Sequence, residues 1–168
     1  LVAFIAFWLI FARDLPDAAA LAEYEPALPS VVRDGNGEPV YSFARERRVQ
    51  LNYDDFPPLL IRAVLSAEDK TFFSHHGVDF TGLAGAVIDY ASKIGSGQRA
   101  KGGSTITQQV AKNLLLGDEY SPTRKIREMI LASRIERAMT KQQILELYLN
   151  QIFLGRNAYG VQAASRAY

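Results

Sequence analysis

Helix-start signals recur along most of this chain and favour a mainly helical fold. Each signal places a proline in a first helical turn, or a serine or threonine where its side chain can cap the first backbone amides. The signals are Pro57-Pro58, Ser104-Thr105, Ser121-Pro122 and the capping box from Thr140 to Gln143. Apolar residues follow at helical spacing, which predicts one helix that carries Glu68 near its C-terminal end and others over 81–94, 104–116, 121–139 and 140–155.

The residues before the first signal fall into two parts. The first twelve, LVAFIAFWLIFA, are apolar and uncharged, but as a helix they rise only about 18 Å against about 30 Å of bilayer hydrocarbon. Since no methionine starts the chain, we interpret them as part of a longer transmembrane helix, with a signal-peptide core cleaved near residues 18–20 as the alternative. Three short strands are expected at 31–32, 40–43 and 49–51, with the hairpin turn DGNGEP at 34–39.

The predicted organisation has three parts. A partial transmembrane anchor (1–12) is followed by a connector with a small β region (13–56) and by one helical catalytic domain (57–168). The last part ends inside an alanine-rich pattern without a capping glycine or proline, which indicates C-terminal truncation. The glycine-rich segment GSGQRAKGG (95–103) is expected to be mobile.

Charge is distributed unevenly along the chain. The net charge of +1 gives no argument for a nucleic-acid partner. Residues 99–141, however, contain nine basic residues against four acidic ones, so an anion could be held there or the charges could be solvated helix faces. The absence of cysteine excludes disulfides, thiol catalysis and cysteine-ligated zinc.

The first chemistry-bearing motif is EDKTFFSHHGVD (68–79). A carboxylate at a helix end beside a loop suits a general base, and apolar neighbours such as Leu65, Phe72 and Phe73 could partly exclude water from it. The alternative is a solvated helix end. A histidine pair with no third ligand nearby is weak support for a metal site, so His75 is interpreted as a hydrogen-bonded structural residue.

Two further motifs point to an anionic group. In KGGSTITQQVAK (101–112), paired glycines precede a helix start whose backbone amides and hydroxyls suit a phosphate, although the pattern of a nucleotide-binding P-loop is absent. In RKIRE (124–128), Arg124 and Lys125 share a helix face with Glu128, in the less favourable order for a simple ion pair. Cations there would suit a diphosphate leaving group, and an ordinary surface pair is the alternative.

The fourth motif, KQQILELYLNQIFLG (141–155), is mainly a core helix. Leu145, Tyr148, Leu149 and Ile152 recur at the spacing of one buried face. Glu146 and Asn150 lie one turn apart, and we assign them structural roles.

Together these motifs resemble a known family. ED..F..H.G.D, GGSTITQQ..KN, RK..E and K..ILE.YLN...LG, in this order, resemble the glycosyltransferase family 51 domain of class A penicillin-binding proteins and monofunctional peptidoglycan glycosyltransferases. The resemblance covers about residues 57–168, and GVQAASRAY (160–168) resembles the start of a fifth motif that normally continues with Phe-Gly.

The resemblance implies a lysozyme-like helical head and a smaller lobe that dips into the membrane. It also implies polymerisation of lipid II, with inversion at the anomeric carbon of MurNAc and release of undecaprenyl diphosphate. The catalytic domain would lie on the periplasmic face of the bacterial inner membrane. Its partners would be lipid II and the growing glycan strand, and it would bind no nucleic acid. A transpeptidase domain could follow Tyr168. The mobile segment 95–103 would cover the acceptor groove.

Roles carry over residue by residue. Glu68 resembles the base that deprotonates the acceptor, and Glu128 resembles the second carboxylate. The residues that resemble the sugar- and diphosphate-binding group are Ser104, Thr105, Gln109, Lys112, Arg124 and Lys125. Asp69, Phe72 and His75 resemble supporting residues. No cofactor is required by the sequence, and Mg²⁺ or Mn²⁺ could bind at the diphosphate, although no ligand cluster specifies either ion.

Two other functions fit parts of the sequence. A lysozyme-like hydrolase also uses carboxylates on a helical fold, but it needs neither a membrane segment nor a basic diphosphate site. A non-enzymatic scaffold for cell-wall assembly would keep the anchor and the helical core, and would make Glu68 dispensable.

Overall fold

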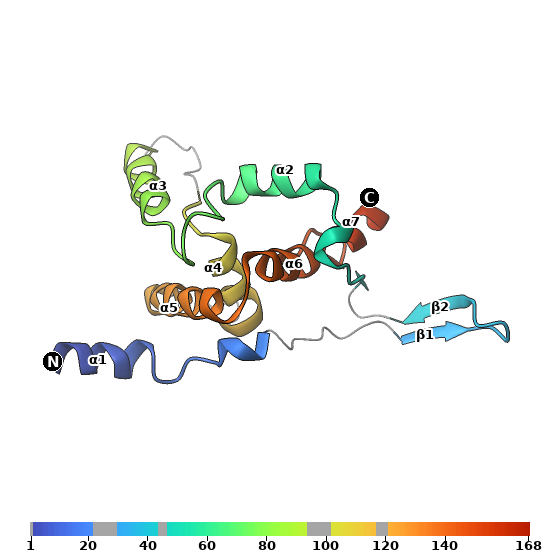
Figure 1. Ribbon diagram of the computed structural model, residues 1–168, viewed down its shortest axis with the longest axis horizontal. Helices are drawn as coiled ribbons and strands as arrows, with labels where there is room; N and C mark the ends of the chain where they lie inside the picture. Colours follow the sequence, from blue (N-terminus) through green and yellow to red (C-terminus); the bar gives the residue numbers. More distant parts are fainter. Residues whose placement is uncertain (1, 22–29, 44–46, 94–101, 117–120) are drawn as a thin grey trace.

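The computed structural model describes residues 2–21, 30–43, 47–93, 102–116 and 121–168. Within them the protein is mainly helical, as expected, and a small β-hairpin projects from one end (Figure 1). The α-helices are α1 (Val2–Phe11), α2 (Pro58–Glu68), α3 (Phe80–Lys93), α4 (Ile106–Ala111), α5 (Pro122–Ala138), α6 (Lys141–Gln151) and α7 (Val161–Ala167). Short helical turns are η1 (Ala18–Leu21), η2 (Tyr53–Asp55) and the π-helical η3 (Lys112–Leu116).

The predicted hairpin is present. Strands β1 (Ser30–Arg33) and β2 (Pro39–Phe43) pair antiparallel, with a shift in register after Val32. The side chain of Asp34 accepts hydrogen bonds from two backbone amides of the turn, and Gly37 adopts φ +85. The third expected strand is wrong in position. It lies at β3 (Arg47–Arg48) and pairs in parallel with β4 (Ala158–Tyr159), near the C-terminus.

The predicted helix starts are confirmed. Thr105, Ser121 and Thr140 are the N-caps of α4, α5 and α6, and Pro58 and Pro122 are the first residues of α2 and α5. The predicted end of α6 at Gly155 is wrong, because Ile152 already turns to extended backbone. The expectation of a mobile segment falls mostly outside the described residues, which resume at Gly102.

The core lies where α4 packs against both α5 and α6, at the centre of Figure 1. Its fully buried side chains come from these three helices and from the loop after α2. The largest apolar ones are Tyr148, Phe72, Ile106, Leu131, Ile135, Ile144, Leu145 and Leu149. Each large side chain contributes about 1.5–3 kcal/mol by leaving water, so this packing fixes the relative positions of the helices that carry the polar motifs.

Helix α1 lies beside α5 and is joined to it by two arginines. Arg127 donates a hydrogen bond to the carbonyl of Ile10, and Arg134 donates to the carbonyl of Ala12, each at 3.1 Å. These carbonyls belong to the last turn of α1 and the residue after it, where a helix leaves acceptors without intrahelical partners and where positive charge is favourable. No helix among the described residues is long and apolar enough to cross a membrane.

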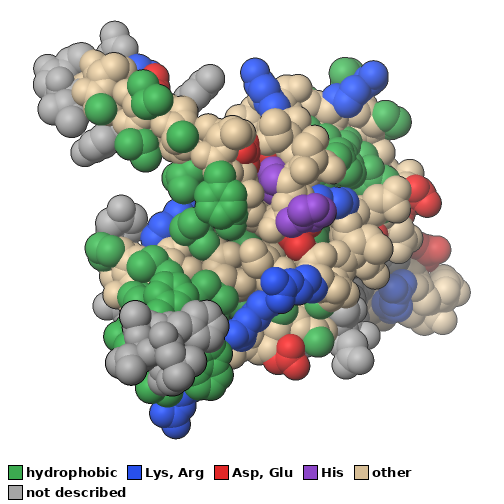
Figure 2. Space-filling view, turned by 60° about the vertical axis from the view of Figure 1, so that its left-hand side comes forward, with side chains coloured by type: hydrophobic (Ala, Val, Ile, Leu, Met, Phe, Trp, Pro, Cys, Tyr) green, Lys and Arg blue, Asp and Glu red, His purple; other side chains and the backbone are tan. Residues whose placement is uncertain are grey.

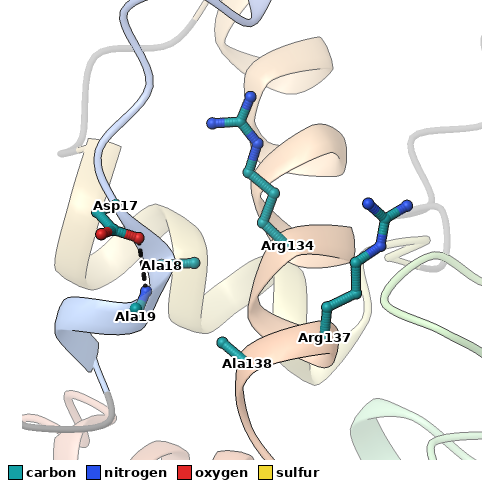
Figure 3. A pocket seen from close by; sticks show the side chains of 6 residues that line it. All are labelled: Asp17, Ala18, Ala19, Arg134, Arg137 and Ala138. Carbon is teal, nitrogen blue, oxygen red and sulfur yellow. Dashed lines mark hydrogen bonds between the residues drawn. The ribbon is translucent and has the colours of Figure 1, made fainter.

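A cavity of about 270 Å³ opens next to this junction (Figure 3). It lies between the segment that leads into η1, where the Asp17 side chain accepts from the backbone N–H of Ala19, and the C-terminal half of α5, which contributes Arg134 and Arg137. None of the predicted site residues lines it.

Figure 2 brings the α1 and α3 end of the molecule forward. Hydrophobic side chains gather on its two projecting lobes, with basic side chains on the surface between them. Among the side chains that the structure describes, the exposed large apolar residues are Phe7, Trp8, Leu9 and Ile10 on α1 and Phe80, Val87 and Ile88 on α3.

Candidate active site

Glu68 is the last residue of α2, and its side chain is exposed. The side-chain amide of Gln109, on α4, donates a hydrogen bond to its Oε2 atom at 3.0 Å. Two predicted site residues that are 41 positions apart in sequence are thus in contact. The expectation that Phe72 and Phe73 exclude water from this carboxylate is wrong, since Phe72 is buried in the core while Glu68 remains open to solvent.

Asp69 joins the end of α2 to the start of α4. Its buried carboxylate accepts a hydrogen bond from the backbone N–H of Ile106 at 3.0 Å, and His75 Nε2 lies 3.0 and 3.1 Å from its two oxygens. Because the backbone N–H of Gly77 donates to His75 Nδ1 at 3.2 Å, that nitrogen is the acceptor and Nε2 carries the hydrogen that points to Asp69. These contacts give His75 the structural position that the sequence predicts.

Thr105 caps α4 and ties it to the loop after α2. Its Oγ1 accepts from the backbone N–H of Gln108 at 3.2 Å, and the Gln108 side chain accepts from the backbone N–H of Thr105 at 2.8 Å. The Thr105 hydroxyl also donates to the carbonyl of Gly77 at 2.6 Å. Gly77 has φ +92, and an added Cβ would lie 2.7 Å from a backbone carbon of Ala132 in α5, so glycine is needed where this loop meets α5.

The second carboxylate is built differently. Glu128 lies on α5 with its side chain 3% exposed, and Lys125 Nζ forms an ion pair with its Oε1 atom. Lys125 also donates to the hydroxyl of Ser104 at 2.6 Å, while 35% of its own side chain remains exposed. The ammonium group is therefore held by two partners on a side chain that is partly exposed.

Residues 104–109 connect the two carboxylates. Ser104, at the start of this segment, contacts the Lys125–Glu128 pair, and Gln109, at its end, contacts Glu68. The backbone N–H of Gln109 donates to the carbonyl of Thr105 at 3.0 Å, so one helical turn separates the two contacts. The motifs predicted from sequence thus converge on the N-terminal end of α4.

Arg124 lies in the first turn of α5, where its backbone N–H donates to the capping hydroxyl of Ser121 at 3.0 Å. It lines a small cavity of about 150 Å³ together with Arg127, Ser121 and Thr123. Two guanidinium-bearing side chains at a helix N-terminus make this cavity electropositive. Lys112, the remaining predicted cation, is half-buried at the other end of α4, where η3 begins.

Tyr148 is a contact of the site that the periodicity of α6 did not reveal. Its hydroxyl donates to Gln109 Oε1 at 3.3 Å, although the ring is 2% exposed and belongs to the core. Burial raises the pKa of the Tyr148 hydroxyl well above its usual range, and the nearby negative charge of Glu68 adds to that effect. A core-face tyrosine carries no sequence signal that separates this position from packing.

The polar residues of α6 that we predicted to be structural do contact backbone. Glu146 accepts from the backbone N–H of Tyr53 at 2.8 Å, and the Asn150 side chain bonds both the N–H and the carbonyl of Leu51, at 3.1 and 2.8 Å. The chain that enters α2 is therefore held against α6.

A second buried ion pair lies beneath the site. Lys141 donates to Glu136 Oε1 at 2.7 Å, and the hydroxyl of the buried Thr107 donates to the same oxygen at 2.6 Å. The Lys141 ammonium also lies 4.4 Å from the centre of the Phe72 ring, a cation–π distance. This pair was not predicted from sequence, because Glu136 lies outside the four motifs and its partners Lys141 and Thr107 come from two different ones.

Asp79, the last residue of the first motif, starts α3. Hydrogen bonds from the backbone N–H of Gly82 and from the hydroxyls of Thr81 and Thr71 hold the pKa of its carboxyl well below its usual range. Its role in this structure is to cap a helix.

Metal binding stays a prediction. Among the residues that the structure describes, no three histidine or carboxylate side chains converge as a protein-made metal site would require. A Mg²⁺ or Mn²⁺ ion at a bound diphosphate would have to take most of its ligands from the substrate and water.

Comparison with known proteins gives one family. The model of the family described as "Transglycosylase" matches residues 36–168. Among curated relatives, Penicillin-binding protein 1A of Rickettsia felis is 49% identical over 160 residues, which is 94% of this chain and 20% of that protein.

Similar relatives occur in other bacteria. Penicillin-binding protein 1A of Rickettsia bellii is 46% identical over 170 residues, covering 100% of this chain and 21% of the relative. That of Neisseria flavescens is 46% identical over 154 residues, covering 92% of this chain and 19% of the relative. The chain spans about a fifth of the length of the curated relatives it matches.

Proposed function

This chain belongs to the transglycosylase family, and we propose that it is a peptidoglycan glycosyltransferase that polymerises lipid II into glycan strands. The similarity to Penicillin-binding protein 1A over nearly the whole chain supports a role in bacterial cell-wall synthesis. The four motifs named from the sequence lie inside the matched region.

In the proposed reaction Glu68 is the general base. Its carboxylate takes the proton from the 4-hydroxyl of the acceptor GlcNAc as that oxygen attacks the anomeric carbon of the donor MurNAc. A C–O bond forms on one face while the bond from carbon to the diphosphate oxygen breaks on the other, so the configuration inverts. The exposed position of Glu68 supports this role, because a base must be reached by the acceptor hydroxyl.

The leaving diphosphate takes the electron pair of the broken bond and needs positive charge, not a proton. Lys125 is held by Ser104 and Glu128 and its side chain is partly exposed, and Arg124 lines the adjacent electropositive cavity. Cations positioned before the reaction stabilise developing charge without reorganisation. Glu128, ion-paired and buried, is assigned to positioning Lys125.

One observation gives this proposal its strongest support. The segment 104–109 contacts an exposed carboxylate at one end and a held ammonium group at the other. A base for the acceptor and a cation for the leaving group are the two functions that inverting transfer from a diphosphate donor requires.

The setting of the domain is part of the proposal. We infer a lysozyme-like helical head, attachment to the inner membrane through α1, and a catalytic face on the periplasmic side. The exposed apolar side chains of α1 and α3 support contact with lipid, and the larger size of the relatives supports further domains, such as a transpeptidase.

The test is polymerisation by the purified chain. Incubation with lipid II in detergent is expected to give glycan strands, and the Glu68→Gln variant is expected to give none. Release of reducing ends from polymeric peptidoglycan, without synthesis from lipid II, would instead support a hydrolase. A chain that does neither, but still binds other cell-wall proteins, would support a scaffold.

A further inference from the structure

The base Glu68 is held by an amide whose own orientation has a second determinant. Resting on the proposed function, we propose that Tyr148 is a positioning residue, which fixes the Gln109 side chain with its donor end towards Glu68. Three helices meet in this contact: α2 supplies Glu68, α4 supplies Gln109 and α6 supplies Tyr148. The bonds are 3.0 Å from Gln109 Nε2 to Glu68 Oε2 and 3.3 Å from the Tyr148 hydroxyl to Gln109 Oε1.

The argument starts from the two ends of a carboxamide. The nitrogen end only donates hydrogen bonds and the oxygen end only accepts them, whereas an ionised carboxylate only accepts. Gln109 can therefore bond Glu68 through Nε2 alone. If the amide turned by 180°, its carbonyl oxygen would face the Glu68 carboxylate, and the contact would become repulsive.

Tyr148 selects between these two orientations. Its hydroxyl donates to Oε1 when Nε2 faces Glu68. In the turned amide Nε2 could donate to the phenol oxygen, but the bond to Glu68 would be lost and the buried hydroxyl hydrogen would lose its acceptor. The ring is 2% exposed within the core, so its hydroxyl cannot move to solvent for another partner. Because burial and the charge of Glu68 raise the pKa of this hydroxyl, Tyr148 keeps its proton and remains a donor at working pH.

The consequence for catalysis concerns an exposed side chain. Glu68 lies at the last residue of α2, where a glutamate has several rotamers open to it. A bond from a fixed amide to Oε2 holds one rotamer and directs the acceptor proton to Oε1. Tyr148 therefore acts on the rate of the chemical step through Gln109, without contact with either sugar.

The main test is a double-mutant cycle in the polymerising protein. Tyr148→Phe keeps the buried ring and removes only the hydroxyl, and we expect it to lower kcat about tenfold, or about 1.4 kcal/mol in the barrier, with KM for lipid II changed less than twofold. Gln109→Ala alone is expected to lower kcat relative to the unaltered protein. Adding Tyr148→Phe to Gln109→Ala is expected to change kcat by less than a further twofold. The matched control is Tyr53→Phe, which changes a half-buried tyrosine packed on the same core and should leave both parameters as they are.

A tenfold effect of Tyr148→Phe that persists in the Gln109→Ala background would overturn the proposal, since the hydroxyl would then act through packing. So would a wild-type kcat in Tyr148→Phe.

A second measurement does not depend on activity. The side-chain amide protons of Gln109, assigned by their loss in Gln109→Ala, should exchange with solvent about tenfold faster in Tyr148→Phe than in the unaltered chain, as followed by ¹⁵N NMR. Equal exchange rates would contradict the proposal even in a chain that polymerises lipid II. A chain that shows the exchange difference but makes no glycan would refute the proposed function and leave the orientation of Gln109 standing.

Discussion

The two carboxylates of the candidate site are held in opposite ways. Glu68 is exposed at the end of α2 and is contacted by a neutral amide, whereas Glu128 is 3% exposed in the middle of α5 and is ion-paired with Lys125. A carboxylate in water with a neutral partner can accept a proton from a substrate. A buried carboxylate that is ion-paired with a lysine instead fixes the position of that cation.

In the proposed reaction this difference separates proton transfer, at Glu68, from charge stabilisation, at Lys125. In the sequence, Glu68 and Glu128 each lie in a short motif with other charged residues nearby, so the sequence alone does not show which of the two is buried. Their surroundings in the fold support different roles, and substitutions at both glutamates and at the partners of Glu128 and Lys125 can test that assignment.

The largest effect is expected at Glu68. Glu68→Gln keeps the shape of the side chain but removes the base, so polymerisation from lipid II should fall by about a thousandfold or more. Thermal unfolding and lipid II binding should change little, because the side chain is exposed. The control is Glu38→Gln in the hairpin, another exposed glutamate, which should polymerise normally. A Glu68→Gln protein that polymerises at a near-normal rate would show that Glu68 is not the base.

The next largest effect is expected from the cations. Arg124→Gln with Lys125→Gln should lower kcat about a hundredfold or more, because the departing diphosphate loses positioned positive charge. Stability should also fall, by about 3 kcal/mol, since the buried Glu128 would lose its ion-pair partner.

Adding Glu128→Gln to that double variant separates the two effects. It removes the buried charge, so the midpoint of thermal unfolding should recover most of its loss while polymerisation stays low. Recovery of activity along with stability would show that these cations serve folding alone.

A smaller effect is expected for Glu128→Gln alone. Lys125 would lose its ion pair but keep its bond to Ser104 and its exposure to water, so kcat should fall about tenfold to thirtyfold and a measurable rate should remain. The pH–rate profile should keep the acid limb of the unaltered protein. If Glu128→Gln lost the acid limb of the profile, the base would be Glu128 and not Glu68.

The smallest effect is expected for Ser104→Ala. Loss of one neutral partner of Lys125 should cost about 1 kcal/mol in the barrier, or about fivefold in kcat. Ser92→Ala, which removes a hydroxyl that bonds a backbone carbonyl in α3, is the matched control and should leave kcat unchanged. A Ser104→Ala effect as large as that of the double cation variant would mean that Ser104 contacts substrate directly.

Local signals in the sequence predicted the helical part of the fold well. A cap such as Thr140 with Gln143 acts within one turn, so the start of α6 is encoded by the residues that form it. The end of α6 was missed because it depends on distant pairing: Phe153 bridges to Tyr159, and Gly160 donates to the carbonyl of Ile152. The position of β3 was missed for the same reason, since its partner lies about a hundred residues later.

The same distinction between local and distant determinants applies to the candidate site. Glu68, Lys125 and Glu128 could be named from motifs, because each lies within a short run of matching residues. The exposure of Glu68, the buried Lys141–Glu136 pair and the Tyr148–Gln109 bond could not, since each depends on how separate helices pack.

The arginines that join α5 to α1 have a mechanical consequence. Arg127 and Arg134 are two turns apart, about 10 Å along the helix, and both bond carbonyls at the C-terminal end of α1. A single hydrogen bond would leave the angle between α1 and α5 free to change, whereas two bonds at separate points on α5 restrain that angle. A tilt of α1 is therefore expected to be accompanied by a tilt of α5. Glu128 lies between the two arginines on α5 and Lys125 lies just before them, so a change in the tilt of α1 would be passed through α5 to the ion pair of the candidate site.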